Sequence, residues 1–415
     1  MDSQHLRGRS EEEELVMRCC ALLAAAAVAL MAAVAVHAED AAEASQPPTA
    51  TLVYLSREAP RDPRSSLTEP VVTEYGWLGA RFGVSELNAN GRFLGKHFEL
   101  LKIVVSSQED IRSRVHRVLN AHPALMVADL APADLLAVAD LNEAKGSVIV
   151  DARTSDDALR GSQCRSSVFH VLPSWEMRAN ALTDFLVRKG WGRWLLLNGS
   201  TADDLAYTNA LRGAARAAGA IIVSEASLPA SDAASSLTQA QVDTRLESLT
   251  RTAAPYDVVL VTDFAGAVGE RVMFNTAFSR LVAGTQGLRA IAWDPQFHDF
   301  AARGFEYRFI RFAAREMSER DYGNWLAVSA LGEAVLRGGV TEPAGVRAFL
   351  RSSRFSVAAF KGEGLTFRST DQQLRQPILL FGPKVLLRLA PADTQRETAG
   401  AAGGGHCNLA AASAG

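Results

Sequence analysis

The sequence predicts an α/β fold made of two successive Rossmann-like lobes. Short apolar runs alternate with segments whose apolar residues recur at helical spacing. This alternation occurs once before and once after about residue 174. Most of the runs are nearly continuous in apolar residues, as in parallel strands that helices cover on both faces. The 415 residues are enough for two such domains.

The first half of the chain contains the first set of alternating elements. Its predicted strands cover residues 51–56, 98–105, 124–130, 147–151 and 167–172. Its predicted helices are one that carries Tyr75, Leu78, Phe82 and Leu87, and two over residues 110–121 and 133–144. The pattern favours a first parallel sheet.

The second half repeats the pattern. The predicted helices cover residues 176–189, 203–218 and 239–251. The predicted strands cover residues 194–198, 220–228 and 256–263, with another inside 281–293. A long helix over 318–337 and a shorter one over 343–351 follow, which predicts a second sheet and then a helical return.

The N-terminus reads as a secretory signal peptide over residues 1–38. An alanine-rich apolar run follows Arg18 and ends in a small residue, Ala38, where we expect cleavage. A retained membrane anchor is the alternative, because the run is about as long as a bilayer core requires. The acidic residues 11–14 are unusual there, so translation from Met17 is an alternative to Met1. Residues 39–50 are predicted to be a flexible leader, and 391–415 a disordered Ala/Gly-rich tail.

Cleavage at Ala38 would leave two cysteines, Cys164 and Cys407. In an oxidising compartment they can pair in a disulfide, and two free thiols are the alternative. The chain has no CxxC motif and no Cys/His zinc spacing, so we expect neither haem attachment nor a structural zinc ion.

Composition and motifs favour binding over catalysis. A net charge of -3 argues against nucleic acid or an anionic membrane as the main partner. No GxSxG, GxxxxGK[ST] or HExxH motif is present. A periplasmic enzyme stays a minor alternative, with Asp129 and Asp263 as its candidate carboxylate pair.

Candidate binding residues lie where predicted strands end, because open α/β sheets bind ligands at the carboxyl ends of their strands. For each residue alone, the alternative is a helix cap or a turn former. Arg57 or Arg153 can pair with a carboxylate of a small polar solute. The candidate residues are Ser56, Arg57, Asp129, Asp151, Arg153, Thr154, Asn198, Asp263, Phe264 and Trp293.

The closing segment carries a resemblance to a known family. Residues 360–368 read Phe-Lys-Gly-x-x-Leu-Thr-Phe-Arg, and residues 371–380 read Asp-Gln-Gln-Leu-Arg-Gln-Pro-Ile-Leu-Leu. With these and with the segments at 90–95, 163–165, 194–197, 292–295 and 317–325, the chain resembles type I periplasmic binding proteins of the branched-chain amino-acid ABC transporter class. It is most similar to a subfamily associated with PQQ-dependent alcohol dehydrogenase systems. The resemblance covers most of residues 51–382.

The resemblance implies two lobes joined by a multi-crossover hinge around a ligand cleft. Lobe 1 would hold residues 51–173 and about 304–352, and lobe 2 residues 174–303 and about 353–390. The implied function is a monomeric periplasmic protein that delivers a small solute to an ABC permease in the inner membrane. Pyrroloquinoline quinone would belong to a partner dehydrogenase. The alternative is a non-transporting sensor or accessory protein of the alcohol dehydrogenase system.

The resemblance also bears on the ligand. In amino-acid binders of this class, the loops after the third and fourth strands hold the α-carboxylate with Ser and Thr. Here one loop starts with Asp129 and the other reads Asp-Ala-Arg-Thr from Asp151. Asp129 is expected to repel a carboxylate. A neutral or cationic solute, or one reached through Arg153, is expected instead.

Residues 360–380 are predicted to form a hairpin that completes the second sheet. Alternation puts Leu365 and Phe367 on one face of the first strand, and Thr366 and Arg368 on the other. Lys361 and Arg375 are expected to be solvated charges at a sheet edge.

Overall fold

The computed structural model describes residues 49–58, 74–119, 122–230, 236–252, 254–266, 268–391, 407 and 409. They lie in one compact unit that begins at Thr49. The predicted signal peptide, both candidate start sites, and nearly all of the leader and the C-terminal tail lie outside the described residues.

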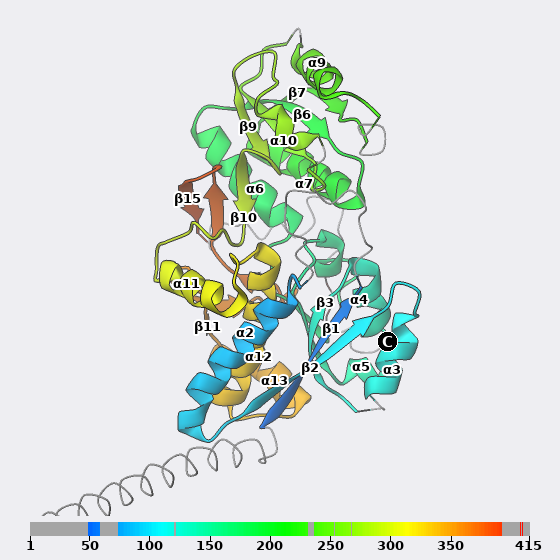
Figure 1. Ribbon diagram of the computed structural model, residues 1–415, viewed down its shortest axis with the longest axis vertical. Coiled ribbons are helices and arrows are strands. Elements are labelled where there is room, and N and C mark those ends of the chain that lie inside the picture. Colours follow the sequence, from blue (N-terminus) through cyan, green and yellow to red (C-terminus); the bar gives the residue numbers. More distant parts are fainter. Residues whose placement is uncertain are drawn as a thin grey trace, which may run out of the picture. The chain divides into compact units, whose positions relative to one another are not determined.

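The first sheet is parallel throughout and has the order β2-β1-β3-β4-β5 (Figure 1). Successive side chains of its strands enter two different cores, as the alternation of a strand requires. Val53 and Ile149 pack with α3, α4 and α5, whereas Leu52 and Val150 pack with α2 and α12. The elements are β1 (Ala50–Arg57), β2 (Phe98–Val105), β3 (Leu125–Asp129), β4 (Val148–Asp151) and β5 (Val168–His170), with α2 (Trp77–Gly91), η1 (Arg92–Leu94), α3 (Ile111–Leu119), α4 (Pro132–Ala139), α5 (Asn142–Lys145) and η2 (Asp157–Arg160).

The second sheet has the order β15-β14-β10-β9-β8-β6-β7 among the described strands. It is parallel from β7 to β10, and β14 and β15 add to it in antiparallel orientation. The segment 281–293, predicted to hold one strand, holds two. The elements are α6 (Trp175–Arg188), β6 (Arg193–Asn198), α7 (Ala202–Ala218), β7 (Ile221–Ser227), α9 (Gln239–Thr250), β8 (Val258–Thr262), α10 (Gly269–Val272), β9 (Leu281–Gly284), β10 (Leu288–Ile291), β14 (Ile378–Phe381) and β15 (Leu386–Ala390). The predicted α/β fold with parallel sheets is confirmed.

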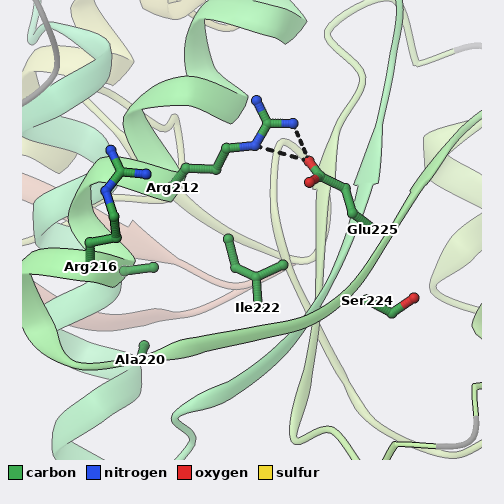
Figure 2. A pocket seen from close by; sticks show the side chains of 7 residues that line it. Arg212, Arg216, Ala220, Ile222, Ser224 and Glu225 are labelled. Atoms are coloured by element: carbon green, nitrogen blue, oxygen red, sulfur yellow. Dashed lines mark hydrogen bonds and ion pairs between the residues drawn. The ribbon is translucent and has the colours of Figure 1, made fainter.

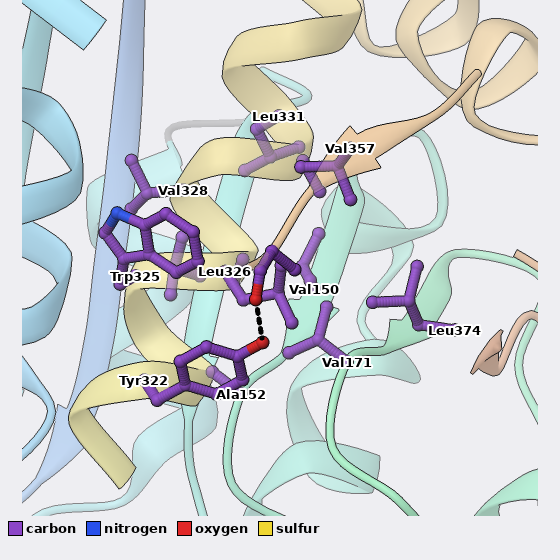
Figure 3. Close-up of a cluster of buried hydrophobic side chains, with 14 of the residues drawn as sticks. Val150, Ala152, Val171, Tyr322, Trp325, Leu326, Val328, Leu331, Val357 and Leu374 are labelled. Atoms are coloured by element: carbon purple, nitrogen blue, oxygen red, sulfur yellow. Dashed lines mark hydrogen bonds between the residues drawn. The ribbon is translucent and has the colours of Figure 1, made fainter. Parts of the chain in front are cut away.

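Three helices follow the second sheet's parallel strands and return to the first sheet: α11 (Ala302–Ala313), α12 (Glu319–Gly338) and α13 (Pro343–Leu350). Figure 3 shows Trp325, Leu326 and Leu331 of α12 in the buried cluster that also holds Val150 and Val357. Helix α2 crosses α12 closely at Gly79, where an added Cβ would lie 2.0 Å from the carbonyl oxygen of Asp321. This close approach explains a glycine inside a helix, where glycine is normally unfavourable.

The chain passes between the two sheets at three described places: after β5, after β10 and after β13. Before the last of these, β11 (Val357–Ala358), β12 (Gly364–Phe367) and β13 (Leu374–Arg375) form a small antiparallel sheet. We call these three passages the hinge. Near these passages, Tyr322 of α12 donates its hydroxyl to the carbonyl of Ala359, which follows β11, at 2.9 Å.

The closing segment differs in part from the predicted hairpin. β12 pairs with β11 and β13 rather than with the second sheet, and only β14 continues into that sheet. Leu365 and Phe367 are buried as predicted. Lys361 is also buried, and its amine donates to Oε1 of Gln376 at 2.7 Å and to the carbonyl of Pro377 at 2.9 Å. The expectation of a solvated Lys361 is therefore wrong, because its side chain is buried against the passage after β13. Arg375 is exposed at the end of β13.

Two further features concern the chain's connections. Cys164 and Cys407 form a disulfide across 243 positions of sequence, with Cα atoms 5.6 Å apart, and it ties the C-terminal tail to the loop before β5.

The predicted helix over 133–144 is divided into α4 and α5 at Asp140 and Leu141. None of the helices in the described ranges has the length and apolar character needed to cross a membrane.

Candidate functional site

Ser56 and Arg57 end β1 at the carboxyl edge of the first sheet. Ser56 is buried beside Asp129, its partner in register on β3. Arg57 makes a two-point ion pair with Asp134 of α4, at 2.6 and 2.8 Å. It also donates to the carbonyls of Ser106 and Glu109. Because its guanidinium is occupied in this way, the geometry favours a structural role for Arg57.

Asp129 is fully buried and bound on two sides. It accepts the hydroxyl of Tyr54 at 2.7 Å and Nε of Arg320, in the first turn of α12, at 2.8 Å. Burial and the neighbouring Asp129 raise the pKa of Tyr54 well above its usual range. Burial alone would lower the pKa of Arg320, but the charge of Asp129 raises it. Because Arg320 offsets the negative charge, the expected repulsion of a carboxylate by Asp129 loses its basis.

Asp151 and Thr154 face the interior rather than a solvent-accessible site. The Asp151 carboxylate accepts from Nδ1 of His170 at 2.8 Å, from the Thr154 hydroxyl, and from the backbone N–H of Arg153 at 3.1 Å. Burial, and then the charge of Arg160, lower the pKa of His170. These contacts hold the loop after β4 in place, so the geometry favours a scaffold role for both residues.

Asn198, Asp263 and Trp293 also have internal partners. Asn198 donates to Glu225 at 2.8 Å and accepts the Thr208 hydroxyl at 3.1 Å. Asp263 accepts the backbone N–H groups that begin α10, the shortest at 2.7 Å. Trp293 is 2% exposed and stacks on Tyr322 with ring centroids 4.7 Å apart. For these three, the alternative reading as turn formers, caps and core residues is favoured.

Arg153 and Phe264 are the predicted residues whose side chains stay available. Arg153 is exposed, and its guanidinium has no hydrogen bond or ion pair with any described residue. Desolvation by neighbouring groups is the largest effect on the pKa of the Arg153 guanidinium and lowers it, and the charge of Arg320 lowers it further. Phe264 is 44% exposed, and its ring centroid lies 4.7 Å from that of Trp175 and 5.9 Å from that of Tyr207.

A series of contacts links the loop that carries Arg153 to Phe264. The loop that carries Arg153 continues to Ser155, whose carbonyl accepts the backbone N–H of Trp175 at 2.8 Å. Trp175 packs on Phe264, whose own N–H donates to Oδ1 of Asp204 at 2.8 Å. Asp203 is next to Asp204 in sequence. The pKa of the Asp203 carboxyl is raised, mainly by partial desolvation, and the charge of Arg153 opposes this rise. We call Arg153, Trp175, Asp203 and Phe264 the cleft site, after the cleft that the family resemblance predicts between the lobes.

The two sides of the cleft site carry opposite charges. On the side of the first sheet, Arg153 and Arg320 together exceed the single charge of Asp129. On the side of the second sheet, Asp203 lies near the like charge of Asp204, and Asp156, in the loop that carries Arg153, repels it as well. The site therefore suits a dipolar solute, with an anionic or acceptor group toward Arg153 and a cationic or donor group toward Asp203.

Trp175 adds an unsatisfied donor. Its side chain is 7% exposed, and among the described residues its indole N–H has no hydrogen-bond partner. Leaving a buried donor unpaired costs about 1–3 kcal/mol. Such a group in a binding site indicates that a ligand or water supplies the missing acceptor. Sequence reasoning missed Trp175, although it is the first residue of α6, directly after a passage between the sheets.

The carboxylate pair of the enzyme alternative is not assembled for joint chemistry. Asp129 is held by Tyr54 and Arg320, whereas Asp263 is held by backbone N–H groups of its own loop. The described part of the chain also holds no group of three His, Cys, Asp or Glu residues placed to bind a metal ion.

A hollow lies between α7 and the edge strand β7, and none of its lining residues belongs to the cleft site. Figure 2 shows Arg212 reaching Glu225, while Arg216 lies beside Ala220 and Ile222 without reaching that carboxylate. Arg216 is exposed and lies outside the cleft site, so its replacement serves as a control for changes at Arg153.

Comparisons with known proteins identify the family and the fold. The chain matches the family model described as "Periplasmic binding protein" over residues 62–384. No curated protein sequence matches it. A periplasmic binding protein from Burkholderia mallei is similar, at 15% identity and a TM-score of 0.63, over 84% of this chain and 96% of that one.

Two further solved structures have similar folds. A branched-chain amino-acid ABC transporter periplasmic ligand-binding protein from Burkholderia xenovorans is 16% identical, with a TM-score of 0.61, over 86% of this chain and 94% of that one. A leucine-, isoleucine-, valine-, threonine- and alanine-binding protein from Brucella ovis, in a closed conformation, is 13% identical, with a TM-score of 0.65, over 85% and 97%. At these identities the structures show the fold, and the family match shows that this chain belongs to the periplasmic binding protein family.

Proposed function

We propose that this protein is the solute-binding subunit of an ABC importer and captures a small polar solute in the periplasm. The observation that carries the proposal is the cleft site, because Arg153 comes from the first sheet's strand ends and Phe264 from the second sheet's. A solute held by both sets of residues links solute binding to movement about the hinge. The proteins of similar fold from Burkholderia xenovorans and Brucella ovis, which bind ligands of amino-acid transporters, support the class of function.

The proposed solute is a dipolar molecule with an apolar or aromatic part. Arg153 and the Trp175 N–H supply donors for a carboxylate or carbonyl oxygen. Asp203 supplies an acceptor at the opposite end, and the exposed face of Phe264 supplies a stacking surface. Of the solutes expected from the sequence, which are neutral, cationic or reached through Arg153, this proposal keeps the last and adds a cationic or donor group toward Asp203.

The link to PQQ-dependent alcohol oxidation stays part of the proposal and rests on the resemblance in residues 360–380. In this form the solute is a substrate or product of a neighbouring quinoprotein dehydrogenase. The alternative is a sensor or accessory protein that uses the same fold and contacts the dehydrogenase instead of a permease. Affinity purification of the protein from periplasm separates the two, because the importer should retain permease subunits and the accessory protein the dehydrogenase.

A metabolite screen by thermal shift tests solute binding directly. A solute at about 100 times its dissociation constant should add about 2.7 kcal/mol to the free energy of unfolding. Small-angle scattering should then show a smaller radius of gyration with the solute than without it. A broad screen of periplasmic metabolites without a single stabilising compound would refute the binding function.

Variants of the cleft site test the residues. Arg153→Ala removes a charge-assisted hydrogen bond and should weaken binding by about 10- to 100-fold. Phe264→Ala should weaken it by about tenfold through lost stacking. Arg216→Ala, in the separate hollow, is the matched control and should leave the dissociation constant unchanged. Equal effects of Arg153→Ala and Arg216→Ala would place the solute elsewhere. Light scattering of the same samples checks the expected monomer.

A further inference from the structure

The 360–362 turn, between β11 and β12, is strained, and its central residue Lys361 is buried while Phe360 is half-buried and Gly362 is exposed. Phe360 has a φ of 56° and Gly362 a φ of 85°, so left-handed residues stand on both sides of Lys361. Left-handed backbone at a non-glycine residue is unfavourable and persists only where the surrounding structure enforces it. An added Cβ at Gly362 would lie 2.8 Å from the ring of Phe300, so no other residue fits there without a shift.

Lys361 connects this turn to the hinge passage that leads to β14. Its side chain is 1% exposed, and its amine donates to Gln376 at 2.7 Å and to the carbonyl of Pro377 at 2.9 Å. Gln376 in turn donates to the carbonyl of Val171, in the passage after β5. A single amine thus links the strained turn to two of the three passages between the sheets.

The surroundings of the amine leave its charge poorly compensated. Its nitrogen lies 5.3 Å from the ring centroid of Tyr322 and makes no ion pair with a described residue. Glu319 of α12 attracts the charge, but Glu319 already pairs with Arg178 of α6 at 3.0 Å, and Arg178 repels it. Burial is the largest effect, and it lowers the pKa of Lys361 from 10.5 to about 7.

We propose that the 360–362 turn is a proton-sensitive latch of the hinge. When Lys361 takes up a proton, the hinge shifts toward an arrangement in which the turn and the Gln376–Pro377 passage separate and water reaches the amine. When Lys361 is neutral, the turn stays docked. The effect of the latch on the hinge needs no solute. Only a consequence of the latch for solute affinity would rest on the proposed function.

The direction and the pH window follow from proton linkage. The pKa of the Lys361 amine is about 7 in the docked form and would be the ordinary 10.5 in a hydrated amine. Between these pH values, the separated form therefore binds a proton that the docked form does not. Lowering the pH from 9 to 7 therefore favours separation by up to about fifty-fold, and below pH 6 the effect is saturated. Glu306, whose pKa burial raises to about 7, titrates mainly below this window and is separated from Lys361 by the stacked rings of Tyr322 and Trp293.

The experiment follows the hinge without a solute. Spectroscopic labels at exposed positions 117 on α3 and 188 on α6 report the distance between the two sheets' helices. In the wild type we expect this distance distribution to change between pH 9 and 7 and to stay constant below pH 6. In Lys361→Met, which keeps a long side chain but cannot be protonated, the distribution should be independent of pH. Lys384→Met, at an exposed lysine, is the matched control and should behave like the wild type.

A second measurement does not depend on any variant. Carbon-13 NMR of lysine side chains in the intact protein should show one amine that titrates near pH 7. A distance that is independent of pH in the wild type, or equally pH-dependent in Lys361→Met, overturns the latch, as does a Lys361 amine that titrates near its ordinary value. Solute binding with none of these pH effects would leave the proposed function standing without the latch. These pH effects without any detectable solute binding would support the latch and contradict the binding function.

Discussion

Glu306→Gln is expected to destabilise the protein at low pH and to stabilise it at high pH. Glu306 lies on α11 with 5% of its surface exposed. It accepts the backbone N–H of Met317 at 2.8 Å and the indole N–H of Trp293 at 3.2 Å. Burial raises the pKa of its carboxyl from 4.5 to about 7, against the effect of those two hydrogen bonds.

A raised carboxyl pKa means that the folded protein binds a proton more tightly than the unfolded chain. The associated stability is present at low pH and is lost as the pH rises from 4.5 to 7. The shift of about 2.5 units corresponds to at most about 3.4 kcal/mol, and about 2.5 kcal/mol of this is lost between pH 5 and pH 8. Glutamine removes the ionisation but accepts one fewer hydrogen bond, at a cost of about 1 kcal/mol.

The variant should therefore be about 1 kcal/mol less stable than the wild type at pH 4.5, and up to about 2 kcal/mol more stable at pH 8. Urea unfolding followed by circular dichroism at several pH values measures the difference. Glu316→Gln, at an exposed carboxylate nearby, is the control and should change stability by less than about 0.5 kcal/mol at every pH. A difference for Glu306→Gln that stays constant from pH 4.5 to pH 8 would refute the reasoning.

Three further changes test the packing and the cross-link. Replacing Cys164 and Cys407 by serine should lower the free energy of unfolding by about 2–5 kcal/mol, because the disulfide closes a long loop. A reductant should lower it equally in the wild type and not in the variant. Arg320→Met should cost about 3–5 kcal/mol by leaving the Asp129 charge buried and unpaired, and adding Asp129→Asn should recover most of it. Gly79→Ala should cost more than about 2 kcal/mol and show no recovery at any pH, since its methyl group would collide with the backbone of α12. Thermal or urea unfolding that shows smaller losses contradicts each expectation.

Local sequence was sufficient where the signal lies within a few residues. The predicted bounds of β2 agree with the structure at both ends, and β8 lies inside its predicted range. α7 and α12 begin at capping boxes, in which Thr201 pairs with Asp204 and Ser318 with Asp321. These interactions depend on neighbours in sequence and are therefore readable from it.

Helix α11 was missed for the opposite reason. Its flanking residues Ala301 and Ala314 are left-handed alanines that provide no side-chain cap. Its inward residues Phe305 and Phe309 pack on Phe82 of α2, which is distant in sequence. Without that partner the segment has no local start or stop signal, so only the folded core defines its ends.

The sequence by itself determined the α/β order, the family and the edge at which a ligand is expected, because strand ends follow from periodicity and topology. It did not determine which charges there are free. Asp129 is neutralised by Arg320, 191 residues away, and Lys361, expected at the surface, is buried in the hinge. Whether a charged side chain is paired, buried or available depends on residues that only the tertiary fold brings near it. For this reason only the structure shows that the side chains of Arg153 and Phe264 are exposed, and only it adds Trp175 and Asp203 to the candidate site.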